Sequence, residues 1–137
     1  MAAASGANTE VRIIPYDEAF YPAIHRMYVE EGWRNLAEND SDTKAAWNHS
    51  SIAFIAVTKE DEAVACLRGF TDTIVTAFIC EMLVEKKYRG LGIGKEFLNY
   101  VHNLYPSTRI ELLATESSRS FYEDEGYRTF YGFRKSY

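Results

Sequence analysis

The chain has 137 residues, of which 47% are hydrophobic and 26% are charged, values typical of one soluble globular domain. With 15% aromatic residues, eight Gly and three Pro, the composition excludes a disordered or low-complexity chain. The formal net charge of −5 has the wrong sign for binding a phosphate backbone. No apolar run reaches the ~18 residues of a membrane span. We therefore expect neither a nucleic acid nor a membrane among the partners.

The start of the chain contains neither the basic segment nor the apolar segment of a secretory signal. We expect residues 1–9 to be a disordered tail and residues 10–137 to form a single domain in the cytoplasm. Cys66 and Cys80 lie within apolar segments, so we expect both thiols to be reduced. The three His residues lack the spacing of metal ligands, and we expect no bound metal.

The first half of the domain combines extended and helical patterns. A short apolar run at 11–14 predicts a strand. Asp17 then offers an N-cap to a helix that ends near Gly32, and a second helix begins at Ser41 or Asp42. Three further strands follow, and short turns join them into an antiparallel meander. These strands are expected at 52–57, 63–70 and 76–84.

The second half of the domain begins with a helical period that runs from Gly92 until Pro106. A strand expected at 110–114 follows, and the helical crossover implies that it pairs in parallel with the strand at 76–84. A short helix and two closing strands complete the domain. They are expected at 117–125, 127–130 and 133–137. The pattern predicts an α/β fold with a single mixed sheet, an antiparallel meander that continues into a parallel pair, flanked by helices.

Acidic residues gather in one segment of this domain, where they are opposed only by Arg34. They are Glu30, Glu31, Glu38, Asp40 and Asp42. One interpretation is a solvated helical surface, which is the usual role of a run of charges. The other is a wall that attracts a cationic small molecule.

A glycine-rich segment joins the strand at 76–84 to the following helix. Gly90, Gly92 and Gly94 allow backbone N–H groups to turn toward one point, and they leave room for a ligand to approach. The first turn of a helix adds unpaired N–H donors and the positive end of its dipole. Arg89 and Lys95 would add positive charge. The segment therefore predicts an anion site, most naturally for a phosphate or pyrophosphate.

Two better-known phosphate motifs do not fit this segment. A dinucleotide fingerprint that begins at Gly90 would need glycine where the chain has Lys95. A Walker A loop would need glycine at Arg89 and serine or threonine at Glu96.

The segment resembles instead the R/Q-x-x-G-x-G/A acetyl-CoA signature of the GNAT family of N-acetyltransferases. The match is Arg-Gly-Leu-Gly-Ile-Gly at 89–94, and the preceding strand at 79–84 is similar to the fourth strand of that family. Downstream, Phe-Tyr-Glu-Asp-Glu-Gly-Tyr at 121–127 resembles its F-Y-x-x-x-G-F segment. The resemblance covers about residues 10–137, and it implies a GNAT-like acyltransferase fold.

The resemblance also implies roles for particular residues. Backbone N–H groups of the signature loop would bind the pyrophosphate of coenzyme A. That loop comprises Arg89, Gly90, Leu91, Gly92, Ile93, Gly94 and Lys95. The pantetheine arm would pair with Met82, Leu83 and Val84, and Thr115 would hydrogen-bond the coenzyme where the family often has Asn. Tyr122 would protonate the departing thiolate.

The general base is less closely specified. The acceptor amine must lose a proton, so a carboxylate that acts directly or through water is expected. Glu81 would flank the cleft if its side chain faces it, and an acidic residue there serves as the base in some family members. Glu111 on the next strand is the other candidate, and an amine that arrives neutral would need neither.

The resemblance thus predicts an acetyl-CoA-dependent N-acetyltransferase that acts by direct attack of a primary amine on the thioester. The acidic segment favours a small cationic molecule as the acceptor. The alternatives are a protein N-terminal or lysine acetyltransferase and a non-catalytic sensor that binds coenzyme A. The expected partners are acetyl-CoA and the amine, and the family allows a homodimer.

Overall fold

Five strands form one sheet in the order β1-β2-β3-β4-β5 in the computed structural model, which describes residues 10–137. Strands β1 to β4 pair antiparallel in succession, and β4 pairs with β5 in parallel. The mixed sheet predicted from the sequence is therefore confirmed. The strands are β1 (Val11–Pro15), β2 (Ile52–Thr58), β3 (Ala63–Thr71), β4 (Thr76–Val84) and β5 (Arg109–Leu112).

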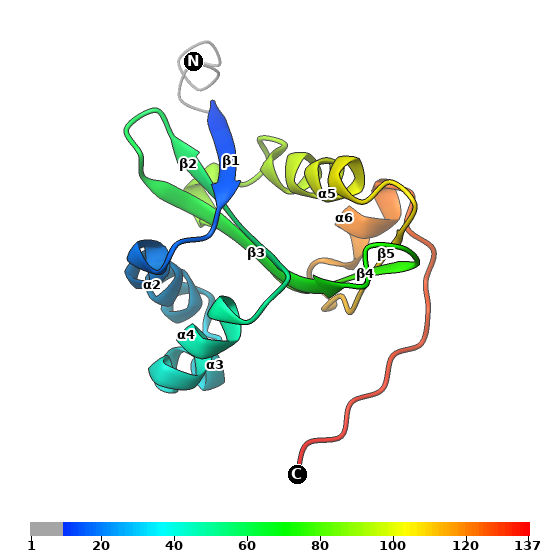
Figure 1. Cartoon of the computed structure of the whole chain (residues 1–137), viewed down its shortest axis with the longest axis horizontal. Coiled ribbons are helices and arrows are strands. Elements are labelled where there is room, and N and C mark those ends of the chain that lie inside the picture. The colour runs from blue at the N-terminus through cyan, green and yellow to red at the C-terminus, as the bar shows by residue number, and fades with distance from the viewer. Residues whose placement is uncertain (1–9) are drawn as a thin grey trace.

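Helices flank this sheet on both sides (Figure 1). The group α2, α3 and α4 lies on one side, and α5 and α6 lie on the other. The helical elements are η1 (Glu18–Phe20), α2 (Tyr21–Glu31), α3 (Arg34–Glu38), α4 (Asp40–Asn48), η2 (Lys86–Tyr88), α5 (Ile93–Leu104) and α6 (Arg119–Asp124). Within the described part of the chain, no helix has the length and apolar character needed to cross a membrane.

The first predicted helix forms as two pieces. Asp17 caps η1, as expected, because its Oδ1 accepts a hydrogen bond of 2.8 Å from the Ala19 N–H. The chain then continues into α2, which ends at Gly32 in the left-handed conformation, with a φ of 80°. The short helix α3 stands between α2 and α4, and the sequence pattern did not predict it.

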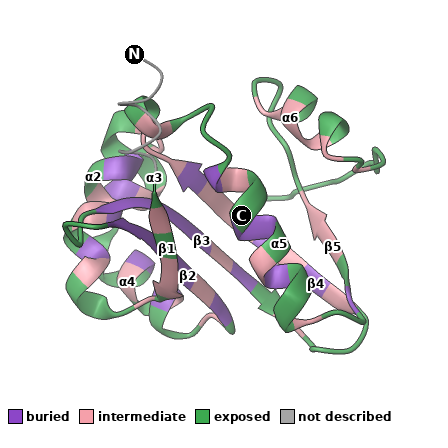
Figure 2. Cartoon of the chain, turned by 90° about the horizontal axis from the view of Figure 1, so that it is seen from above, coloured by how far each residue is buried: buried purple, intermediate pink, exposed green. Residues whose placement is uncertain are grey.

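The buried side chains form two clusters, one for each face of the sheet. Figure 2 shows that buried residues are concentrated along β2 and β3. On the α5 face, Phe97 and Val101 are fully buried against the sheet. On the α2 face, Ile24, Tyr28 and Trp47 are buried to the same degree, with at most 1% of each exposed. Burial of large apolar side chains on both faces supplies the main driving force for this fold.

A β-bulge interrupts β4 at Cys80. Arg68 of β3 lies opposite Glu81, whereas the next residue, Gly69, lies opposite Ile79, so Cys80 has no partner on β3. Ile79 is buried in the α5-face cluster, yet Leu83, four residues later, is buried in the α2-face cluster. Strict alternation would have placed both on the same face. The bulge therefore turns Glu81 toward α2.

The pairing between β4 and β5 covers only the first half of β4. Residues 76–79 pair with residues 109–112, after which the two strands part. The second half of β4 keeps its hydrogen bonds to β3 and leaves its other edge open. This opening positions the site described below.

The two closing strands predicted at 127–130 and 133–137 are not formed, and that prediction was wrong. The Tyr127 N–H bonds to the Tyr122 carbonyl at 3.0 Å, and the chain beyond leaves the body of the protein as an extended segment (Figure 1). A strand requires a ladder partner as well as suitable side chains, and this segment has none within residues 10–137. The alternating aromatic side chains identified the propensity but not the missing partner.

The close packing of β3 on β4 at Gly69 gives a test of the fold. An ideal Cβ at Gly69 would lie 2.2 Å from the Phe78 carbonyl oxygen, so Gly69→Ala forces the two strands apart. We expect it to lower the free energy of unfolding by about 3 kcal/mol, measured by urea denaturation. Gly32→Ala is the control, because its Cβ meets no atom within 4 Å and only the left-handed conformation opposes it. That control should lose about 1 kcal/mol. Equal losses in the two variants would contradict this account of Gly69.

Candidate active site

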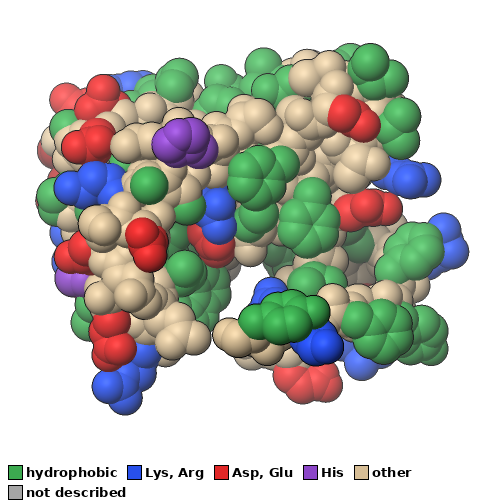
Figure 3. Space-filling model, turned by 60° about the horizontal axis from the view of Figure 1, so that its bottom comes forward, with side chains coloured by type: hydrophobic (Ala, Val, Ile, Leu, Met, Phe, Trp, Pro, Cys, Tyr) green, Lys and Arg blue, Asp and Glu red, His purple; other side chains and the backbone are tan. Residues whose placement is uncertain are grey.

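A cavity of about 1010 Å³ opens where β4 and β5 part. Its floor is the second half of β4, and residues 31–36, from the end of α2 into α3, form one wall. The opposite wall comes from the end of β5, α6 and the C-terminal segment. In the space-filling view, the molecule is hollowed between these two walls (Figure 3).

The cavity brings together most of the residues that the sequence singled out. Those that line it are Glu81, Met82, Leu83, Val84, Arg89, Gly90, Gly92, Ile93, Gly94, Thr115 and Tyr122. Leu91 and Lys95 are exposed and are not part of its lining. Lys95 therefore contributes its backbone N–H to the start of α5 rather than a charge inside the cavity. Glu111 also lies outside the lining, beside Arg109 at 3.3 Å, which removes it from the position that a base would need.

The signature loop has the open backbone that an anion site requires. Gly90 and Gly92 adopt left-handed conformations, with φ of 77° and 89°, and an added Cβ at either would meet no atom within 4 Å. The bond from the Glu96 N–H to the Gly92 carbonyl, 3.0 Å long, is the first of α5. The N–H groups of residues 93–95 therefore precede the helical ladder and remain available to a ligand. The helix dipole adds positive potential at the same end.

Arg89 stabilises the shape of this loop. Its Nε donates to the Val84 carbonyl at 2.7 Å, and its Nη2 pairs with the Glu31 carboxylate at 2.5 Å. The guanidinium thus ties the loop both to the end of β4 and to the end of α2. Since its charge is already matched by Glu31, the backbone N–H groups supply most of the attraction for an anion.

Glu81 lies at the centre of a polar network on the floor of the cavity. Arg68 donates to its two carboxylate oxygens, from Nε at 2.8 Å and from Nη2 at 2.5 Å. Tyr28 donates its hydroxyl to Glu81 Oε1 at 2.9 Å and accepts from the Trp47 indole N–H at 2.9 Å. The side chains of Arg68 and Glu81 are only 13% and 11% exposed. Three donors and little contact with water hold this carboxylate in one orientation.

Tyr122 faces the floor of the cavity from α6. Its ring packs edge-on against Phe121 and Tyr127, at centroid distances of 5.0 and 5.6 Å. Burial, with a smaller contribution from Tyr127, raises the pKa of the Tyr122 hydroxyl to about 12. The phenol therefore stays protonated at neutral pH and is able to donate a proton or a hydrogen bond.

The acidic segment lies mostly outside the cavity, contrary to the wall proposed from the sequence. Glu38 pairs with Arg34 on the surface, Asp40 accepts from the Tyr21 hydroxyl, and neither carboxylate lines the cavity. Asp42 does not line it either. Glu31 does, but it is paired with Arg89. The solvated surface is thus the better interpretation of this run of charges.

Several lining residues were not singled out by the sequence analysis, among them Trp33, Arg34 and Arg134. Trp33 and Arg34 come from the turn between α2 and α3, and Arg134 comes from the C-terminal segment. The first two follow Gly32, so the end of the predicted helix was a usable signal. Nothing in the local sequence places Arg134 near β4. Among residues 10–137, no group of three or more His, Cys, Asp or Glu side chains is arranged to hold a metal ion.

The Arg68–Glu81 pair gives a prediction about stability. Arg68→Leu leaves Glu81 as a mostly buried carboxylate without its cation, and we expect a loss of about 3–5 kcal/mol in urea denaturation. The double variant Arg68→Leu/Glu81→Leu removes both charges and should regain a large part of that loss. If the double variant is no more stable than the single one, the pair does not act as a compensated charge.

Comparison with solved structures supports the fold. An acetyltransferase of the GNAT family from Streptococcus pneumoniae superposes with a TM-score of 0.74 at 17% identity, over 93% of this chain and 97% of the other. A GNAT acetyltransferase from Staphylococcus aureus gives 0.69 at 19% identity, with coverage of 87% and 85%. A Trypanosoma brucei acetyltransferase gives 0.65 at 15% identity, with coverage of 93% and 99%. At these identities the likeness establishes the fold alone.

Comparison of the sequence itself establishes the family. No curated protein sequence matches the chain. The family model of the acetyltransferase (GNAT) domain matches residues 49–129, which is more than half of the chain and includes the signature loop and Tyr122. The protein therefore belongs to the GNAT family of acetyltransferases.

Proposed function

We propose that the chain transfers the acetyl group of acetyl-CoA to the nitrogen of a primary amine. The observation that carries this proposal is the placement of three features around one cavity. These are the open glycine loop at the start of α5, the free edge of β4 and the protonated phenol of Tyr122. Each matches a different part of an acyl thioester of coenzyme A.

The residues of the cavity fit the coenzyme in kind. The N–H groups of residues 93–95 would hold the pyrophosphate at the positive end of α5. The edge of β4 that β5 leaves open at 82–84 offers backbone groups to the amide-containing pantetheine arm, as an added strand would. Thr115 lines the opposite side of the cavity and would hydrogen-bond the coenzyme. The bound thioester supplies the acetyl group and the thiolate leaving group.

The transfer itself needs one bond to form and one to break. The amine nitrogen attacks the carbonyl carbon, and the carbon–sulfur bond breaks with its electron pair going to sulfur. A backbone N–H of β4 would stabilise the charge that develops on the carbonyl oxygen. The Tyr122 hydroxyl would give its proton to the departing sulfur, which suits a phenol that is held protonated.

The proton of the attacking amine has two routes in this proposal. Glu81 lines the cavity and stays a candidate base, but accepting a proton would oppose its bonds from Arg68 and Tyr28. Water could accept the proton instead, and an amine that arrives neutral needs no base. Donation of a proton to sulfur by Tyr122 is therefore better supported than removal of a proton from the amine by Glu81.

The identity of the amine is left open in this proposal. The acids that favoured a small cationic acceptor lie outside the cavity lining, so the structure gives a cationic acceptor no support. A protein N-terminus or lysine remains the alternative acceptor. Release of thiol from acetyl-CoA in the presence of small cationic, neutral and peptide amines separates these classes. Release with none of them, despite binding, would favour a sensor of coenzyme A. A homodimer and a cytoplasmic location likewise stay predictions.

Coenzyme binding is tested at Gly92. Gly92→Val places a side chain where the backbone should approach the pyrophosphate, so acetyl-CoA should no longer raise the melting temperature. Gly126→Val is a matched control, because Gly126 has the same φ of 89° and no atom within 4 Å, but lies outside the cavity. The control carries the same backbone strain and should keep the ligand-induced shift. A full shift in Gly92→Val would refute the loop assignment.

The role of Tyr122 is tested by removal of its hydroxyl. Tyr122→Phe keeps the ring and should lower kcat by about 10²–10⁴-fold with little change in the KM for acetyl-CoA. Tyr127→Phe, on the ring that packs against Tyr122 but outside the cavity, should retain near-normal kcat. Because the pKa of Tyr122 is raised to about 12, its donation should persist as pH rises to about 10 and fail only above that. An unimpaired kcat in Tyr122→Phe would exclude it as the acid.

A further inference from the structure

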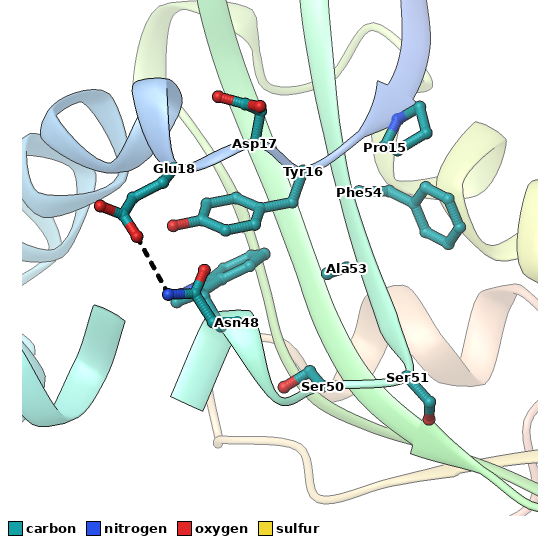
Figure 4. Close-up of a pocket in the computed structure, with 10 residues that line it drawn as sticks. Pro15, Tyr16, Asp17, Glu18, Asn48, Ser50, Ser51, Ala53 and Phe54 are labelled. Carbon is teal, nitrogen blue, oxygen red and sulfur yellow. Dashed lines mark hydrogen bonds between the residues drawn. The ribbon is translucent and has the colours of Figure 1, made fainter. Parts of the chain in front are cut away.

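A second pocket, of about 460 Å³, lies apart from the cavity at the start of β2. It is bounded by the end of β1, by η1, by the end of α4 and by the start of β2, and its lining shares no residue with the cavity (Figure 4). Its volume is within the range of small-molecule sites. The proposed acetyl transfer makes no use of it.

The charge of this pocket is wholly acidic. Asp17 and Glu18 line it, and none of its lining residues is Lys, Arg or His, whereas three arginines line the cavity. Glu18 Oε1 accepts from the Asn48 side-chain amide at 3.0 Å across the pocket, as the dashed line in Figure 4 marks. Asp17 Oδ1 accepts from the Ala19 N–H. Within residues 10–137, the second oxygen of each carboxylate has no hydrogen-bond partner and no cation.

The pocket also contains an unsatisfied hydroxyl. The Tyr16 oxygen is buried without a hydrogen-bond partner, and it is the one side-chain polar atom of the described residues in this condition. Figure 4 shows this hydroxyl directed toward the side of the pocket where Glu18 and Asn48 meet. Burial raises the pKa of Tyr16 to about 12, and the nearby charges of Glu18 and Asp17 act in the same direction. A buried polar atom without a partner is costly and rare in native proteins.

The remaining wall is aromatic. The Tyr16 ring packs on Trp47 with a centroid distance of 4.9 Å, and Trp47 is 1% exposed. An aromatic wall beside carboxylates that lack a cation is the usual environment for a positively charged nitrogen with a short hydrocarbon chain.

We propose that this second pocket is a binding site for a small organic cation with a primary ammonium group. The ammonium N–H groups would reach the free oxygen of Glu18, and a small rotation of the Tyr16 side chain, whose hydroxyl has no hydrogen bond to lose, would bring that hydroxyl to the ligand. The hydrocarbon part would lie along the Tyr16 ring, which packs on the buried Trp47, and Asp17 at the rim would attract the cation. The site is separate from acetyl transfer and does not depend on that activity.

Trp47 offers a direct reporter of this site. The chain has two Trp residues, and the other, Trp33, lines the cavity. In ¹⁵N-labelled protein the two indole N–H signals are assigned with Trp33→Phe. Titration with 1,4-diaminobutane dihydrochloride should shift the Trp47 signal along a saturable curve. The uncharged 1,4-butanediol, and NaCl at the same ionic strength, should give no saturable shift.

Matched variants locate the binding. Asp17→Asn/Glu18→Gln keeps the oxygens that accept from Ala19 and Asn48, and it should raise the Kd for the diamine about tenfold or more. Glu38→Gln/Asp42→Asn removes the same charge outside both pockets and should leave the Kd within about twofold. Tyr16→Phe should raise both the melting temperature, because it removes a buried unsatisfied hydroxyl, and the Kd.

Results of three kinds would overturn the proposal. The first is the absence of a saturable Trp47 shift with the diamine. The second is an equal Kd in the two charge-neutralised variants, which would indicate general attraction to an acidic protein, or an unchanged Kd in Tyr16→Phe. The third is a shift that survives Asp17→Asn/Glu18→Gln but disappears in Glu81→Gln, which would place the diamine in the cavity. The melting temperature of each variant shows whether it is folded.

Discussion

β4 is hydrogen-bonded to β3 beyond the point at which β5 leaves it, and this unequal pairing shapes the rest of the site. Backbone groups on an open strand edge ordinarily invite another strand, so their exposure inside a fold needs a partner of some kind. A ligand that carries amide groups meets that need. The same divergence brings the start of α5 and the side of α6 to face each other across the gap. One interruption of a ladder therefore provides the space, the backbone partners and the two walls.

The electrostatics of the cavity depend more on geometry than on free charge. Its two carboxylates are each held by an arginine, Glu31 by Arg89 and Glu81 by Arg68. What remains for a ligand is a set of oriented backbone N–H groups and a neutral phenol, which need little reorganisation during a reaction, together with the Arg134 guanidinium of the C-terminal segment. The ion pairs therefore hold α2, the signature loop and the strands β3 and β4 at fixed distances.

Much of the fold could be predicted because its signals are local. Alternation and helical spacing identified β2, β3, β4 and α5, and the glycine spacing identified the loop with most of its lining residues. Contacts between distant segments could not be predicted in this way. The network of Tyr28, Arg68 and Glu81 joins a helix to two strands, and the absence of a ladder for residues 127–137 depends on where β5 ends. Such features follow from tertiary packing, which the hydrophobic periodicity of the sequence does not report.

The bulge at Cys80 shifts the alternation of β4, so that odd-numbered residues face the α5 layer before it, as Ile79 does, and the α2 layer after it, as Leu83 does. The number of residues in this strand therefore affects which face each side chain takes, whatever the identity of those residues. Loss of Cys80 would place Glu81 directly after Ile79 and restore a regular ladder, in which Glu81 still faces α2 and Met82 still faces the α5 layer. The loss of a residue between Glu81 and Val84 would instead exchange the faces of the residues that follow it in the strand. An alignment with a relative that lacks the bulge should therefore place its one-residue gap at Cys80, because a gap elsewhere in β4 would assign the intervening side chains to the wrong face.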